Sequence, residues 1–256
     1  VWATITARDA VVYKDNDFEI FLDPDGDTHN YYELEVNAFG TEWDLILLKT
    51  YHDDLAPALD SWDIPGLITK VHIDGTLNDP SDRDKGWGVE IAIPWKSLIG
   101  NFRSNTPPKE GEQWKVNFSR VHWDVEIKDG RYIKTDSPEF NWVWSPQGII
   151  YMHMPEFWGL VQFTEIAPGK ETVQFIPSEI DLIKRSLRKL YTRQRNYYFH
   201  KERYTSSLKE LNLLEKPIEG VPWPPKVVVT PSGWEAVVRW DSKSVFIRKD
   251  GKVWVE

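Results

Sequence analysis

Cysteine is absent from the 256-residue sequence. Its absence excludes a disulfide framework and every zinc site built from thiolates. No hydrophobic run approaches the ~20 residues that a membrane-spanning helix requires. Positive charge is scarce, because 31 Lys and Arg stand against 40 Asp and Glu, giving a net charge of −9. Sequence-independent nucleic-acid binding needs a basic surface, so this balance argues against a nucleic-acid partner.

Aromatic residues, by contrast, are abundant: the chain holds 14 Trp, 10 Tyr and 11 Phe. We expect most of these rings in a β-rich core, since flat rings pack well on pleated surfaces. A few can serve another purpose, because a ring can stack on the apolar C–H face of a sugar while polar neighbours bind the hydroxyl groups. The composition therefore favours a β protein and leaves a sugar-binding surface open.

The segments 17–23 and 31–37 alternate between apolar and polar residues and flank a turn-rich stretch, which predicts a β-hairpin. Alternation puts Phe18, Ile20, Leu22, Leu34 and Val36 on the core face. The opposite face receives Asp17, Glu19, Glu33, Glu35 and Asn37. That second face is too acidic to pack against apolar partners. It is expected to be either solvated or the floor of a polar groove.

Further strands are expected at 43–48, 69–74, 86–95 and 114–123, with a tight turn at 128–131. Helical periodicity is nearly absent as far as Phe163. Short strands at close spacing predict a mainly β protein, an antiparallel β-sandwich that is jelly-roll-like with immunoglobulin-like layers.

The pattern changes after Pro168. A helix is expected to begin after Ser178, with a second short helix at about 206–211 and a small β-meander over 227–255. We therefore predict two domains, a sandwich of residues 1–168 and an α+β appendage of residues 169–256. The basic face of the first helix should pack on the acidic sandwich or face solvent. Its members are Lys184, Arg185, Arg188, Lys189, Arg193 and Arg195.

Several segments match a known family in their order along the chain: 16–27, 31–37, 89–95, 117–120, 144–146 and 154–159. Over about residues 1–165 the chain resembles the family 9 carbohydrate-binding modules. The resemblance implies a domain that binds an oligosaccharide or polysaccharide without cleaving it. It also implies a secreted, periplasmic or cell-surface protein of a polysaccharide-degrading system. Such modules carry further β-structure before the hairpin, so we expect an N-terminal part to be missing and residues 1–6 to form a paired strand.

The resemblance also implies two facing aromatic rings with polar side chains between them. Tyr13 occupies the position of one ring, and Glu19 that of a hydroxyl-binding carboxylate. Met152 and Glu35 stand where the second ring and an arginine are expected, so Trp142, Trp144, Tyr151 or His153 would have to supply the second ring. The predicted sugar-binding set is Tyr13, Glu19, Glu35, Asn37, Arg120, Trp144 and His153.

Asp23, Asp25 and Asp27 place carboxylates at alternate positions, as at the start of a calcium-binding loop. Gly26 falls at the fourth position rather than the sixth, and a hairpin turn is the commoner explanation. Calcium is thus a possible ligand, and no cofactor is required.

Two other functional classes remain open. The chain could be a haem-binding electron-transfer domain of related fold, since Met152, His153 and Met154 are potential haem ligands. A distant partner such as His29, His72 or His122 would be needed for the other face of the haem. The chain could instead be an interaction module that has lost sugar binding. The acidic face could supply a carboxylate pair for glycoside hydrolysis, yet no nucleophile motif, phosphate loop or metal-ligand spacing accompanies it. We predict no catalytic residue.

Overall fold

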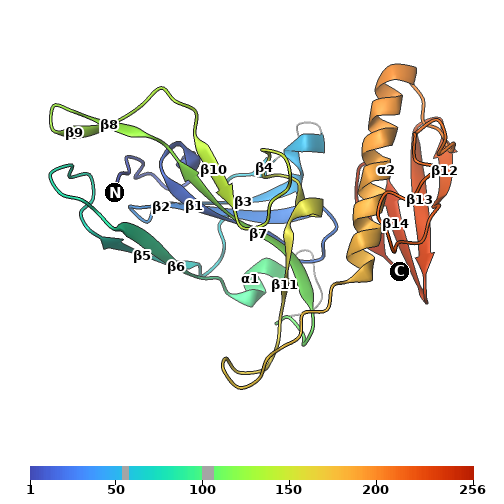
Figure 1. The fold of residues 1–256 in the computed structure, drawn as a ribbon, viewed down its shortest axis with the longest axis horizontal. Helices are drawn as coiled ribbons and strands as arrows, with labels where there is room; N and C mark the ends of the chain where they lie inside the picture. The colour runs from blue at the N-terminus through green and yellow to red at the C-terminus, as the bar shows by residue number, and fades with distance from the viewer. Residues whose placement is uncertain (54–57, 100–106) are drawn as a thin grey trace.

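The computed structural model describes residues 1–53, 58–99 and 107–256 (Figure 1). The helices are α1 (Trp95–Ile99) and α2 (Glu179–Lys201), with short 3₁₀ helices at Val12–Lys14, Tyr51–Asp53 and Pro155–Phe157. The strands are β1 (Asp17–Asp23), β2 (His29–Asn37), β3 (Glu42–Lys49), β4 (Ala58–Leu59), β5 (Ile68–Asp74), β6 (Gly86–Ala92), β7 (Gln113–His122), β8 (Val125–Lys128), β9 (Arg131–Lys134), β10 (Phe140–Val143), β11 (Gly159–Gln162), β12 (Lys226–Thr230), β13 (Gly233–Trp240), β14 (Lys243–Arg248) and β15 (Val253–Val255). This is the mainly antiparallel β architecture that the sequence predicts.

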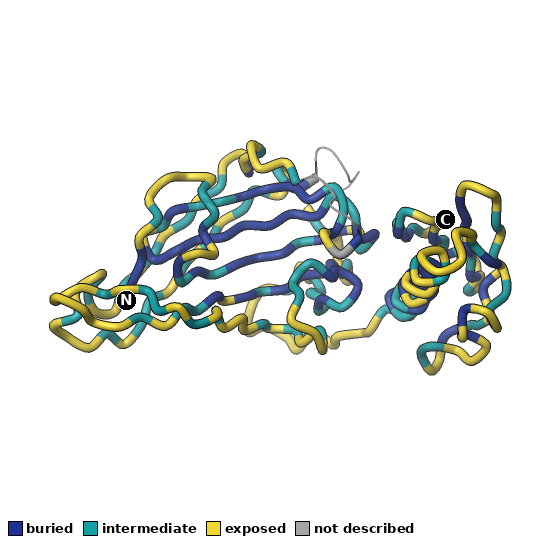
Figure 2. The backbone as a smooth tube through the Cα atoms, turned by 90° about the horizontal axis from the view of Figure 1, so that it is seen from above, coloured by how far each residue is buried: buried dark blue, intermediate teal, exposed yellow. Residues whose placement is uncertain are grey.

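A central sheet organises the first two thirds of the chain, with strand order β10-β7-β1-β2-β3-β4 and β11 also paired with β7. The predicted hairpin forms its middle, with Glu19 of β1 opposite Glu35 of β2. Its turn passes through Gly26 at φ +60°, a backbone conformation that glycine adopts without strain. Figure 2 shows the middle of this sheet as mostly buried, and β1, β2, β3 and β7 hold its buried residues.

One face of this sheet carries the apolar core. Leu34 and Val36 are buried there and pack with Val71, Val89 and Ile91 of the β5–β6 hairpin, which forms the second layer of the sandwich. Farther along the same face, Tyr32 packs with Leu98 of α1, and its hydroxyl donates to the Leu98 carbonyl at 2.5 Å. The predicted core face of the hairpin is confirmed.

The C-terminal part of the chain forms a second packed unit. Strands β12 to β15 make a four-stranded meander, and α2 lies against it (Figure 1). Leu187 and Leu190 of α2 are fully buried with Val245 and Ile247 of β14. The predicted helix and meander are confirmed. The domain boundary at residue 168 stays a prediction.

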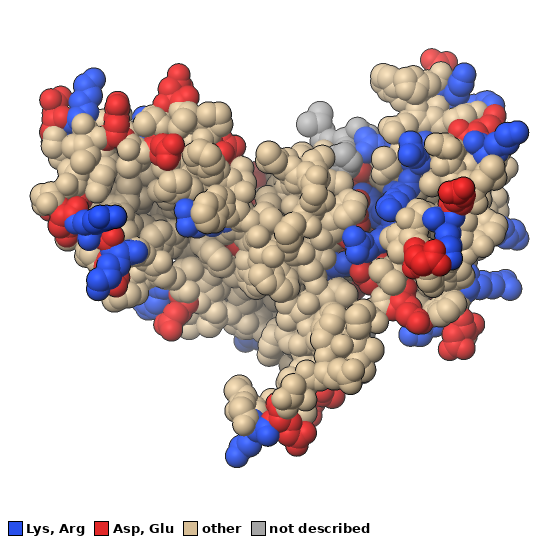
Figure 3. All heavy atoms as spheres, viewed as in Figure 1, with Lys and Arg blue, Asp and Glu red and all other residues tan. Residues whose placement is uncertain are grey.

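Part of the basic face of α2 contacts the sandwich, while Lys189 donates to the Pro217 carbonyl of the C-terminal unit. Figure 3 shows Lys and Arg side chains gathered between the two parts of the molecule. Arg188 is buried and its guanidinium donates to Asp53 and Glu156, each at 3.1 Å. Lys115 of β7 pairs with Asp181 of α2 at 2.7 Å. The centre of this basic face therefore packs on the acidic sandwich, which is one of the two predicted alternatives.

Two expected elements are not formed. Residues 1–6 contain no strand, because side chains rather than a neighbouring strand take their backbone groups: the amides of Thr4 and Ile5 both donate to Asp15 at 2.7 Å. The expected short helix at 206–211 is a series of turns, closed at Asn212 with a left-handed φ of +55°.

Candidate functional site

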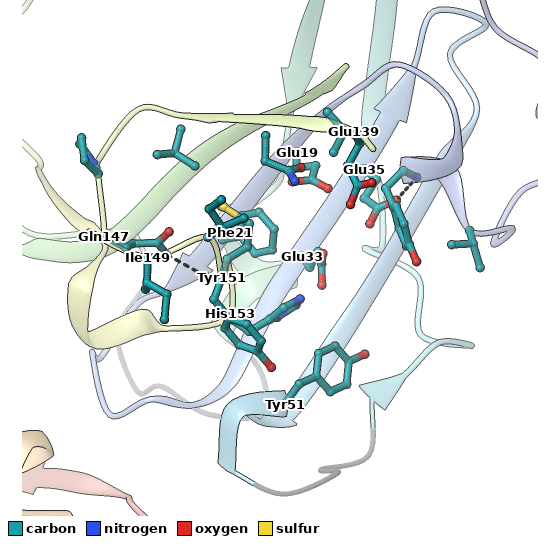
Figure 4. Close-up of a pocket in the computed structure, with 18 of the residues that line it drawn as sticks. Glu19, Phe21, Glu33, Glu35, Tyr51, Glu139, Gln147, Ile149, Tyr151 and His153 are labelled. Atoms are coloured by element: carbon teal, nitrogen blue, oxygen red, sulfur yellow. Dashed lines mark hydrogen bonds between the residues drawn. The ribbon is translucent and has the colours of Figure 1, made fainter. Parts of the chain in front are cut away.

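A cavity of about 880 Å³ lies on the other face of the central sheet (Figure 4). Strands β1, β2 and β3 supply its floor, and the segment from 139 to 153 covers it. Its lining residues are Val11, Tyr13, Glu19, Phe21, Glu33, Glu35, Trp43, Tyr51, Val121, Glu139, Asn141, Val143, Pro146, Gln147, Gly148, Ile149, Ile150, Tyr151, Met152 and His153.

Carboxyl groups form the floor of this cavity. Glu33 and Glu35 are two residues apart on β2 and therefore point to the same side, where Glu19 of β1 lies opposite Glu35. All three are at most 5% exposed. Asp17 extends the group, since oxygens of Asp17, Glu19 and Glu35 lie within 4.8 Å of one another. The expectation of a solvated acidic face is wrong, because the segment 139–153 covers it; the alternative of a groove floor describes the structure.

Burial changes the protonation of these groups. Desolvation raises the pKa of Glu19 to about 7, and it raises the pKa of Glu33 and Glu35 well above 4.5, with neighbouring carboxylates adding to the shift. Glu19 Oε2 and Asp17 Oδ2 are buried without a hydrogen-bond partner among the described residues. The carboxyl groups of the floor therefore keep their protons to higher pH than free glutamates do.

Aromatic rings stand around this floor. Tyr13 lies within the 3₁₀ helix Val12–Lys14 and is 39% exposed. Its backbone amide donates to Glu35 Oε2 at 2.8 Å. Trp43 lies beside Glu35 on β3, and its indole Nε1 has no partner among the described residues. Tyr51 and Tyr151 line the other end of the cavity (Figure 4).

His153 closes this aromatic end. Its Nδ1 lies 2.8 Å from the Tyr31 hydroxyl, and its ring meets Tyr51 edge-on at a centroid distance of 4.6 Å. Burial lowers the pKa of His153 to about 4, so the ring is neutral at pH 7. His29, His72 and His122 do not line this cavity, so it brings no second histidine to a haem beside His153.

The cavity unites Tyr13, Glu19, Glu35 and His153 of the predicted binding set. Asn37 lies outside it and has a structural role. Its side-chain amide donates to the Ile5 carbonyl at 2.8 Å, and its oxygen accepts the amides of Phe39 and Thr41 at 3.0 Å. These bonds close the β2–β3 turn, which accounts for an asparagine at this position.

Arg120 and Trp144 also lie apart from this cavity. Arg120 pairs in register with Phe18 and faces the opposite side of the sheet, where it lines a second cavity of about 600 Å³. Its guanidinium stacks on Trp142 at 4.8 Å. Trp144 is 53% exposed and packs edge-on against Phe118. The structure therefore separates these two from the other predicted residues.

Several lining residues were missed by the sequence analysis as binding residues. The alternation of β2 places Glu33 on the same face as Glu35, so the sequence already indicated Glu33 as a residue of the same site. Tyr51, Glu139, Asn141 and Gln147 come from irregular segments or strand ends, where no sequence period indicates what a side chain faces.

The aspartates of the β1–β2 turn do converge, with one oxygen from each of Asp23, Asp25 and Asp27 within 4.8 Å. Their carboxylates are already engaged: Asp23 accepts the amides of Gly26 and Thr28 at 3.0 Å. Lys252 pairs with Asp27 at 3.0 Å, and Lys184 donates to the carbonyl of Asp25 at 2.6 Å. Backbone amides of the turn and two lysine side chains already bind the oxygens that would ligate a metal ion, so these residues fit calcium poorly. Calcium binding remains a prediction.

No protein-family model and no curated protein sequence matches this chain. One solved structure is similar in part, a candidate carbohydrate-binding protein from Bacteroides uniformis ATCC 8492. The identity is 18% and the TM-score 0.43, and the alignment covers 63% of this chain and 66% of that one. In the described residues no helix is long and apolar enough to cross a membrane.

Proposed function

We propose that the protein binds carbohydrate in the cavity on the acidic face of the central sheet. The observation that carries this proposal is the arrangement of buried carboxyl groups, Glu19, Glu33 and Glu35, beneath rings such as Tyr13 and Trp43. The volume of about 880 Å³ is within the range of small-molecule sites, roughly 300–1,000 Å³.

The chemistry of the lining suits a sugar. Hydroxyl groups donate and accept hydrogen bonds, and a carboxyl group can accept in either protonation state and donate when it is protonated. Tyrosine and tryptophan rings cover the apolar faces of a pyranose, and they also exclude water from the hydrogen bonds beneath. Glu19 and Trp43 both line the cavity, and Glu19 Oε2 and Trp43 Nε1 are a buried acceptor and a buried donor without partners among the described residues.

Binding without cleavage is part of the proposal. A glycosidase needs two carboxyl groups whose environments push their pKa values apart, one acid holding a proton and one ionised base or nucleophile. Here the same burial raises the pKa of Glu19, Glu33 and Glu35 together. The accompanying placement in a secreted polysaccharide-degrading system rests on the sequence resemblance alone.

A glycan array followed by isothermal titration calorimetry of the best ligand tests the proposal. Tyr151→Ala should weaken binding at least about tenfold, since hot-spot aromatics contribute more than ~1.4 kcal/mol. Tyr132→Ala on β9 is the matched control, because Tyr132 does not line the cavity and its loss should leave affinity unchanged. An array without any bound glycan, or equal affinity of both variants, overturns the proposal.

A further inference from the structure

The cavity has an imbalance of charge. Glu19, Glu33, Glu35 and Glu139 line it, and among the residues the structure describes no lysine or arginine does. Its one basic group, His153, is neutral at pH 7 because burial lowers its pKa to about 4. A ligand that enters therefore meets four acidic side chains and, among the described lining residues, no lysine or arginine that could pair with them.

Several other buried acids of this molecule are paired with cations, although Asp15 and Asp23 accept hydrogen bonds from uncharged groups instead. Arg188 and Arg195 both reach Asp53 at 3.1 Å, Lys115 reaches Asp181 at 2.7 Å, and Arg8 pairs with Asp44. The cavity floor departs from this pattern within the described part of the chain, where no ion pair involves Glu19, Glu33 or Glu35.

Two buried acceptor oxygens at or beside the floor lack partners in the described part of the chain: Glu19 lines this cavity, whereas Asp17 lines the second cavity of about 600 Å³. Glu19 Oε2 and Asp17 Oδ2 belong to residues no more than 5% exposed, and neither has a hydrogen-bond partner among the described residues. Oxygens of Asp17, Glu19 and Glu35 converge within 4.8 Å, a spacing at which one positively charged donor can serve more than one of them. Leaving buried acceptors unpaired costs free energy, so the site is built for a donor that arrives with the ligand.

We propose that the cavity selects a sugar with a free, protonated amino group, a hexosamine unit with its nitrogen directed at Glu19 and Glu35. The proposal rests on the proposed carbohydrate binding and specifies its ligand class. An ammonium group provides three donors and a positive charge, which suits the converging carboxylates. The rings of Tyr13 and Trp43 then cover the pyranose and add cation–π attraction.

A bare divalent cation would also bind carboxylate oxygens, but it would make no favourable contact with the aromatic and apolar residues that line the rest of the cavity. A cavity of about 880 Å³ with Tyr13, Trp43, Tyr51 and Tyr151 around it has room and apolar surface for a ring-sized organic ligand. These walls favour an organic cation over a metal ion.

Calorimetric titration with three matched oligosaccharides tests the inference: β-1,4-linked glucosamine oligomers, their N-acetylated counterparts and cello-oligomers of equal length. They share a backbone and differ in whether the second carbon carries an ammonium, an amide or a hydroxyl group. We expect glucosamine oligomers to bind at least about tenfold more tightly than either neutral series, with the preference shrinking as salt rises.

Glu19→Gln and Glu35→Gln should each reduce the ratio of glucosamine-oligomer affinity to cello-oligomer affinity about tenfold or more. Both replace a buried acid by a neutral isostere, so folding should survive; circular dichroism confirms it. Glu90→Gln, on the exposed side of β6, is the matched control and should change nothing.

The outcomes separate the inference from the function on which it rests. Equal affinity for all three series overturns the amino-sugar inference and leaves carbohydrate binding standing. Absence of binding to every sugar overturns both. Stabilisation by calcium chloride or spermidine, in a protein that binds no glucosamine oligomer, likewise refutes the inference in favour of a simple cation site.

Discussion

At the scale of single residues, the cavity floor brings several acidic side chains together, and their burial costs folding free energy. Glu19 and Glu35 face each other across the hairpin, and the pKa of each is raised by desolvation. A protein selected for stability alone would place apolar or paired groups there. Unfavourable residues that are retained in a cavity are best explained by what they bind.

The titration of Glu19 gives the first prediction. Burial raises its pKa from 4.5 to about 7. Below pH 4.5 the carboxyl is protonated in folded and unfolded chains alike. Between pH 4.5 and 7 the unfolded chain ionises first, so the folded state loses stability as pH rises. Relative to Glu19→Gln, the free energy of unfolding of the native protein should fall by about 2–3 kcal/mol across this window.

Urea unfolding of both proteins from pH 4 to 8 measures this difference. The buried His153 is common to both, so its own titration cancels in the comparison. Glu19 titrates together with the neighbouring carboxyl groups, so the pH range over which stability falls can be broader than for a single group. Parallel stability profiles for the two proteins would falsify the burial of an ionisable Glu19.

Tyr13 gives the second prediction. Its contacts with the fold run through its backbone: the amide donates to Glu35 and the carbonyl accepts the Trp123 indole, each at 2.8 Å. Tyr13→Ala keeps both bonds and removes only the ring. It should weaken binding of the array-identified sugar by about 1–3 kcal/mol while leaving the melting temperature nearly unchanged. Phe39→Ala, a similarly exposed ring outside the cavity, should leave affinity unaltered.

At the scale of elements, the β1–β2 hairpin was predictable and its surroundings were not. A period of two residues fixes which side chains share a face, and the turn residues fix where the strands reverse. Alternation says nothing about what covers a face. The segment from 139 to 153, which turns the acidic face into a cavity, folds without a repeating pattern. For the same reason Tyr51 and Gln147 carried no signal in the sequence.

The docking of α2 on the sandwich gives the third prediction. Arg188 is 2% exposed and joins α2 to Asp53 and Glu156, two acids of the sandwich. Arg188→Met would leave those acids buried and short of their partner, which should cost about 3–5 kcal/mol. The exposed pair of Arg203 and Glu210 is the matched control, since Arg203→Met should cost less than about 1 kcal/mol.

Chemical denaturation quantifies both variants, and limited proteolysis between residues 163 and 178 reports whether α2 has separated from the sheet. A destabilisation by Arg188→Met no larger than that of the control would show that the ion pairs contribute little to docking.

At the scale of the whole molecule, composition and strand spacing were enough for the architecture, and they were insufficient for the site. Tyr13, Glu19, Glu35 and His153 share a cavity, whereas Arg120 points to the other side of the same sheet. Successive side chains of a strand point to opposite faces of the sheet, and Val121 lines the cavity, so its neighbour Arg120 points to the other face. The sequence order of a family resemblance does not report the face on which a residue lies.

The last prediction concerns the class of the molecule. The sequence offers no nucleophile motif beside the acidic residues, and the structure shows Glu19, Glu33 and Glu35 buried. Enclosure alone does not make a hydrolase, because burial raises the pKa of Glu19, Glu33 and Glu35 alike, whereas a glycosidase needs one carboxyl held ionised beside a protonated acid. We expect no release of reducing sugar from glucan, chitosan or xylan oligomers by the pure protein. Steady turnover that disappears in Glu19→Gln would establish a glycosidase, whereas release that persists in Glu19→Gln would trace to a contaminating enzyme. The assay is informative near pH 6–7, since there Glu19, with its pKa of about 7, still carries its proton in a large share of molecules.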